Sequence, residues 1–169
     1  NIEKNMKSTM ASIYKSFECS KNSNDLIYYV EDDYIHQKGA LTEMLFAFEK
    51  FATILKRDVF ILPVDYPYLY KSNELTNLLV GEKYHWRTVR ESLLTFLTSN
   101  QMINKYYSNL IEMASNESIP FESNLHKIYD NELCLSPVPS LAFHCTNVNS
   151  VYGLSPTLNW KEIWNDLEK

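Results

Sequence analysis

The sequence has 169 residues, of which 45% are hydrophobic and 22% charged, and this is enough to bury one core but not two, so we expect a single domain over residues 1–169. Sixteen Lys and Arg residues against 21 Asp and Glu residues leave a formal charge of -5, and the basic residues are scattered, which argues against a nucleic-acid partner. No run approaches the roughly 18 apolar residues of a membrane-spanning helix, so we expect no transmembrane segment.

Hydrophobic periodicity predicts a helix and then a strand–helix–strand unit in the first third of the chain. Apolar residues at helical spacing over residues 6–17 predict a helix that ends in a polar loop. The continuous apolar run at 26–30 is typical of a strand covered on both faces in a parallel sheet. An amphipathic helix over 41–55 and an apolar strand at 59–62 follow, so these segments predict a βαβ unit with a right-handed crossover.

The rest of the chain alternates short apolar runs with segments of helical spacing. Residues 63–77 lose all periodicity and carry closely spaced Pro and Tyr residues, which predicts an ordered loop. The expected strands are 78–80, 84–88, 92–97, 133–135 and 141–143, and the expected helices are 102–114, 121–129 and 160–167. This order of elements predicts an α/β domain.

Three consecutive carboxylates, Glu31, Asp32 and Asp33, come directly after the expected strand at 26–30. Adjacent carboxylates repel one another unless a cation or a hydrogen-bond network neutralises them. In open α/β sheets, ligands gather outside the carboxyl ends of the strands, which is where this triplet is expected. An acidic, solvated turn explains the triplet equally well when it is considered by itself.

The run LIYYVEDDYIH at residues 26–36 resembles the metal-binding segment of nucleotide-sugar glycosyltransferases with the GT-A fold, in which a carboxylate triplet ends a central strand. Further short motifs are similar to those of bacterial family-2-like glycosyltransferases. They are HWRT at 85–88, SLLTF at 92–96, SPVPSLAFH at 136–144, and LSP at 154–156 followed by Trp160. The resemblance covers most of the chain from Asp25 onward. It implies a partial GT-A, Rossmann-like α/β fold, with a mixed sheet flanked by helices.

The resemblance also implies a nucleotide-sugar donor and a divalent cation, Mn²⁺ or Mg²⁺. Asp33 would bind the cation with help from Glu31, while Asp32 would contact the ribose. His144 stands where such enzymes often have a late histidine ligand, and an imidazole beside carboxylates suits Mn²⁺ better than Mg²⁺. A histidine after an apolar strand is also commonly a structural residue. If His144 is a ligand, its imidazole nitrogen should lie within about 5 Å of an Asp33 carboxylate oxygen even without metal.

An inverting transfer needs a base that takes the proton from the acceptor hydroxyl, usually a carboxylate at the start of a helix. Glu122 is the first candidate because it lies at the start of the expected helix at 121–129. Asp65 and Glu91 are the second and third candidates. An acid in the first turn of a helix is explained just as well by the helix dipole.

Two further residues are candidates for donor binding. Arg87 would hold the diphosphate by bidentate hydrogen bonds, and Trp86 would stack on a sugar face. The alternative interpretation makes Trp86 a core residue and Arg87 a surface charge.

Three cysteines without CxxC spacing argue against a disulfide framework and a structural zinc site, so we expect a reducing, cytoplasmic location. A GT-A domain begins with strands that build the nucleotide-base pocket, whereas this sequence begins at the helix before the acidic strand. We therefore expect it to be the carboxyl-terminal part of a glycosyltransferase catalytic domain, inactive without its missing amino-terminal portion. The acceptor, whether a sugar, a lipid-linked group or a protein, is not indicated. Two other classes stay open: an inactive carbohydrate-binding or assembly module, and a metal-dependent phosphoryl or nucleotidyl enzyme.

Overall fold

The structure is a computed structural model that describes residues 8–71, 73–115, 122–145 and 159–168. It is an α/β fold with a six-stranded mixed sheet of order β1-β6-β3-β7-β5-β4, flanked by helices, as the sequence predicted. The strands are β1 (Leu26–Tyr29), β3 (Phe60–Ile61), β4 (Leu78–Val80), β5 (His85–Val89), β6 (Phe96–Ser99) and β7 (Cys134–Val138). A separate ribbon pairs β2 (Tyr34–His36) with β8 (Ala142–His144).

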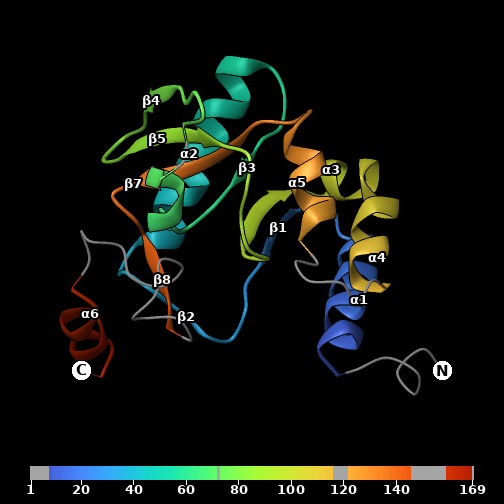
Figure 1. The fold of residues 1–169 in the computed structure, drawn as a ribbon, viewed down its shortest axis with the longest axis horizontal. Coiled ribbons are helices and arrows are strands. Elements are labelled where there is room, and N and C mark those ends of the chain that lie inside the picture. Colours follow the sequence, from blue (N-terminus) through green and yellow to red (C-terminus); the bar gives the residue numbers. More distant parts are fainter. Residues whose placement is uncertain (1–7, 72, 116–121, 146–158, 169) are drawn as a thin grey trace.

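Helices cover both faces of the sheet. The described residues form α1 (Ser8–Ser20), α2 (Ala40–Leu55), α3 (Asn100–Lys105), α4 (Tyr107–Ser115), α5 (Ser123–Tyr129) and α6 (Trp160–Leu167). Figure 1 shows α1, α4 and α5 together on one side of the molecule, whereas α6 lies away from them near the C-terminal end. Within the described segments, no helix combines the length and apolar character needed to cross a bilayer.

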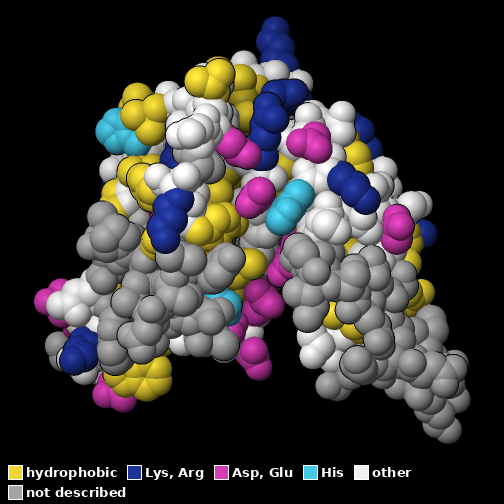
Figure 2. Space-filling view, in the orientation of Figure 1, with side chains coloured by type: hydrophobic (Ala, Val, Ile, Leu, Met, Phe, Trp, Pro, Cys, Tyr) yellow, Lys and Arg dark blue, Asp and Glu magenta, His cyan; other side chains and the backbone are white. Residues whose placement is uncertain are grey.

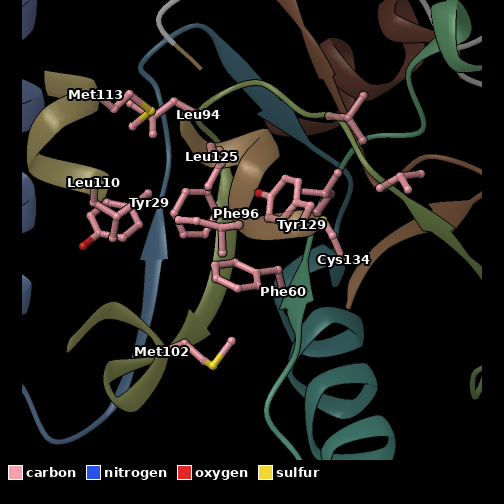
Figure 3. Packing of buried hydrophobic residues seen from close by; sticks show 14 of the residues in the cluster. Tyr29, Phe60, Leu94, Phe96, Met102, Leu110, Met113, Leu125, Tyr129 and Cys134 are labelled. Atoms are coloured by element: carbon pink, nitrogen blue, oxygen red, sulfur yellow. The ribbon is translucent and has the colours of Figure 1, made fainter. Parts of the chain in front are cut away.

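Side-chain alternation in the central strands divides the core into two clusters. In β6, Phe96 belongs to the cluster with α1, α4 and α5, whereas Leu97 belongs to the cluster with α2. In β3, Phe60 and Ile61 divide in the same way. Figure 3 shows the first cluster, in which the Phe96 ring centroid lies 5.0 Å from that of Tyr29 and 5.5 Å from that of Phe60. Strands covered by helices on both faces explain the continuous apolar runs of the sequence.

The expected position of β1 in a parallel sheet is wrong. In the sheet as described, β1 is an edge strand, and its neighbour β6 is antiparallel to it. Because β6 is also antiparallel to β3, β1 and β3 run in the same direction without pairing. Among the described strands, only β3 and β7 form a parallel pair. The apolar run in β1 reflects contact with both core clusters through Tyr29 on one face and Tyr28 on the other.

Two other segments differ from the sequence prediction. The strand expected at 92–97 begins only at Phe96, because polar atoms before it bond to side chains; the Ser92 hydroxyl, for example, donates to the Tyr129 hydroxyl at 3.0 Å. The helix expected at 102–114 is two helices that meet at Tyr106. Residues 6, 7, 121 and 154–156, which carried sequence predictions, lie outside the described residues.

Gly81 closes the β4–β5 hairpin at a point where no side chain fits. A Cβ atom there would lie 2.5 Å from the Tyr84 carbonyl oxygen and 2.6 Å from the Trp86 indole nitrogen. We therefore expect Gly81→Ala to lower the free energy of unfolding by about 1–3 kcal/mol, as overpacking does elsewhere, measured by denaturant unfolding. Asn77→Ala, just before the same hairpin, is the control. Asn77 forms its hydrogen bonds to Thr88 through backbone atoms, so this variant should change the free energy of unfolding by less than about 0.5 kcal/mol. Equal unfolding midpoints for the two variants would contradict the prediction.

Candidate functional site

The β2–β8 ribbon brings the two ends of the predicted metal site together. Asp33 precedes β2 directly, and the antiparallel register places Tyr34 opposite His144. The Cys145 N–H donates to the Asp33 carbonyl oxygen at 2.7 Å and continues the ribbon by one hydrogen bond. As a result, His144 Nε2 lies 2.6 Å from Asp33 Oδ2, across 111 positions of sequence.

The proximity expected of Asp33 and His144 is therefore confirmed, since 2.6 Å is well inside the limit of about 5 Å. When a carboxylate is ionised it only accepts hydrogen bonds, and the proton of such a contact then lies on Nε2 of the imidazole. The His144 side chain is nearly buried, and that of Asp33 remains partly open to solvent. A cation that bound both groups would take the place of this proton.

Glu31 lies in the same acidic site and is held by a residue that the sequence did not suggest. The Glu31 N–H donates to Thr95 Oγ1 at 3.3 Å, and the Thr95 hydroxyl donates to Glu31 Oε2 at 3.5 Å. Burial above all, together with the nearby charges of Asp33 and Glu122, raises the pKa of Glu31 to about 7. Asp32 is exposed in the turn between Glu31 and Asp33.

The shifted pKa of Glu31 predicts a pH-dependent loss of stability. In the folded chain Glu31 keeps its proton up to about pH 7, whereas its ordinary pKa is 4.5, so the folded state binds more protons between these values. The free energy of unfolding contributed by this group therefore falls as pH rises through the pKa of about 7. Glu31→Gln cannot ionise, so it should stabilise the protein more at pH 8 than at pH 5 in denaturant unfolding. The same difference between variant and wild type at both pH values would contradict this.

Of the three candidates for the base, the structure brings only Glu122 to the triplet. Its side chain is half-buried at the start of α5, makes no capping hydrogen bond there, and its charge acts on Glu31. The Glu91 side chain is exposed. The Asp65 carboxylate is buried and already engaged by Arg87 and by the Tyr70 hydroxyl.

The two donor-binding candidates lie in the interior. Arg87 Nε and one terminal nitrogen donate to the same Asp65 oxygen at 2.9 and 2.6 Å, and the guanidinium lies 4.4 Å from the Tyr70 ring centroid. The Trp86 side chain is completely buried, with its ring edge-on to Phe51 of α2. In this structure Trp86 is a core residue with no open face for a sugar, and the hydrogen bonds of Arg87 go to a carboxylate instead of a phosphate.

A groove with a volume of about 750 Å³ runs between α1 and the open edge of β1 and ends at the triplet. Its walls combine apolar side chains, such as Ile13 and Ile27, with the hydroxyls of Ser12 and Ser16. Figure 2 shows acidic side chains gathered where this face of the molecule is hollowed. The carboxyl end of β1 therefore opens into a space large enough for a small-molecule ligand.

The site offers few side chains that could bind a metal ion. Among the described residues, no group of three or more His, Cys, Asp or Glu side chains is arranged to hold a metal ion. Asp33 and His144 supply one carboxylate and one imidazole at contact distance, with the Glu31 carboxyl group close by. Such a pair fits a cation such as Mn²⁺ that completes its coordination with ligand oxygens and water.

Comparisons with family models, curated proteins and solved structures find no match for this chain.

Proposed function

We propose that this protein takes part in the metal-dependent transfer of a sugar from a nucleoside-diphosphate sugar to an acceptor. The observation that carries the proposal is the 2.6 Å contact between His144 and Asp33 at the end of β1. Two residues that are far apart in the sequence, each a candidate cation ligand by resemblance to GT-A glycosyltransferases, meet beside a groove that can take a nucleotide.

Each residue has a role in this proposal. Asp33 and His144 hold a divalent cation, Mn²⁺ or Mg²⁺, and a bound cation stabilises the negative charge on a departing nucleoside diphosphate. Glu31 adds a further carboxyl group beside Asp33, and the exposed Asp32 faces the groove, where a ribose would be bound. Glu122 is the candidate that receives the proton of the acceptor hydroxyl, because its charge acts on the triplet.

The groove supports a ligand of nucleotide size. Its volume of about 750 Å³ lies within the range of about 300–1,000 Å³ that is usual for small-molecule sites. Hydroxyls on α1 line one wall and the triplet lies at one end. A donor bound here would have its diphosphate at the carboxylates, so a cation between them is needed to offset the repulsion.

The cytoplasm is the location that we propose for this activity. The three cysteines are free: Cys134 is buried, Cys19 is exposed, and Cys145 is half-buried beside the site. Free thiols are typical of a reducing compartment.

The test is calorimetric titration of UDP, GDP and ADP into the protein, with and without Mn²⁺. We expect one nucleoside diphosphate to bind in the presence of Mn²⁺ and to lose binding when the cation is removed or when Asp33 is replaced by asparagine. Glu18→Gln is the control, because it also removes one carboxylate charge but from an exposed side chain of α1, and it leaves the triplet intact. Two outcomes would overturn the proposal: sugar binding that needs no metal would favour a carbohydrate-binding module, and hydrolysis of nucleoside triphosphate would favour a phosphoryl or nucleotidyl enzyme.

A further inference from the structure

The ring of Tyr34 lies flat against the imidazole of His144. The two residues face each other across the β2–β8 ribbon, and their ring centroids are 4.8 Å apart with only 13° between the ring planes. Both side chains are buried. The stacked face of Tyr34 therefore covers the imidazole whose Nε2 points at Asp33.

Among the described residues, His144 has no partner for the contact that usually sets the orientation of a metal-binding histidine. Such a histidine normally donates its second ring N–H to a carboxylate, a carbonyl or water. Nδ1 of His144 is buried and has no hydrogen-bond partner among the described residues. Since the second torsion of a histidine side chain has a broad energy profile, the ring needs another restraint to keep Nε2 directed at Asp33.

Tyr34 is well fixed for this task. Its hydroxyl lies 2.7 Å from the hydroxyl of Tyr66, which is completely buried. The Tyr66 ring is in turn stacked on Tyr68, with centroids 5.6 Å apart. Tyr34 is thus anchored at its backbone by the ribbon and at its hydroxyl by the core.

We propose that Tyr34 is a positioning residue that holds the His144 imidazole by stacking, in place of a hydrogen bond at Nδ1, for which the described residues supply no partner. A rotation of the imidazole about its own torsion would drive its edge into the Tyr34 ring. The role of this positioning in cation binding depends on the proposed function, whereas the positioning itself can be measured without metal.

The test compares Tyr34→Phe, which keeps the ring, with Tyr34→Leu and Tyr34→Met, which keep apolar bulk but remove the aromatic face. In the metal-free protein, NMR of ¹⁵N-labelled histidine should show the His144 Nε2–H as a downfield proton protected from exchange in the wild type and in Tyr34→Phe. The proton should be lost in the two aliphatic variants. Mn²⁺ affinity should fall by about tenfold in the aliphatic variants and change by less than about threefold in Tyr34→Phe, in line with the effects of groups that orient metal ligands.

Circular dichroism shows whether each of the two aliphatic variants folds, so that a folding defect is not mistaken for a loss of positioning. If either one folds and keeps the protected Nε2–H, the proposal is overturned. Tyr66→Phe removes the hydroxyl partner but not the stack, so it should keep the signal. If the wild type shows the protected proton but binds no Mn²⁺, the proposed function fails while the positioning role of Tyr34 stands.

Discussion

Replacing Asp33 by asparagine should weaken Mn²⁺ binding by about 100-fold or more, because this change removes a ligand, and loss of a group that only orients ligands already costs about 10–100-fold. Asparagine preserves the shape of the side chain, and the Asp33 carbonyl oxygen still accepts the hydrogen bond from the Cys145 N–H. The charge of the ligand is what changes. Paramagnetic broadening of resonances near the triplet, or calorimetry, measures the affinity.

The triplet contains its own matched controls. Asp32→Asn removes the same charge from the same turn, but Asp32 is exposed and should affect Mn²⁺ affinity much less than Asp33. Glu31→Gln should have an intermediate effect on Mn²⁺ affinity, because water can partly replace a carboxylate that only assists the main ligand. If the wild type and Asp33→Asn bind Mn²⁺ with equal affinity, the cation site is not at this position.

Replacing Asp65 by asparagine should lower the free energy of unfolding by about 3–5 kcal/mol, which is a large part of the total stability of a typical domain. The side chains of Arg87 and Asp65 are only 10% and 4% exposed, so the variant leaves a guanidinium buried without its counter-charge. Tyr70 also loses a charged acceptor for its hydroxyl. Denaturant unfolding measures the effect.

A second ion pair provides the contrast for this prediction. Lys15 and Glu18 also lie 2.6 Å apart, but their side chains are 58% and 47% exposed, so Glu18→Gln should cost less than about 1 kcal/mol. The double replacement of Asp65 by leucine and Arg87 by methionine should recover most of the stability, since it leaves no unpaired charge. If Asp65→Asn costs as little stability as Glu18→Gln, the Arg87–Asp65 pair is exposed to solvent in solution and the prediction is wrong.

Local periodicity was sufficient to predict the helices and strands in which apolar residues recur at a regular spacing. The helix expected at 41–55 is α2 with one more residue at its start, and the helix at 160–167 has the expected bounds. The strand at 78–80 is also confirmed. These patterns are readable because each depends on neighbours three, four or two positions away in the same segment.

Strand pairing could not be predicted from local periodicity. The apolar run at 26–30 has the same composition whether it lies at the centre of a parallel sheet or at the edge beside an antiparallel partner. The partner of β1 is β6, in which Ser99 faces Leu26, and nothing local to either strand specifies the other. The burial of Trp86 and the pairing of Arg87 with Asp65 are non-local in the same sense.

The sequence by itself determined the α/β class, the carboxylate triplet at the end of a strand, and His144 as a residue to look for beside Asp33. Only the tertiary structure decided which residues share that place, because side chains more than 60 positions apart meet through strand pairing and helix packing. The tertiary structure places the Thr95 hydroxyl and the Glu122 charge beside Glu31. It also stacks Tyr34 on His144. It also placed Trp86 in the core and turned Arg87 towards Asp65, since burying an aromatic ring and neutralising a buried charge depend on neighbours that only the folded chain supplies.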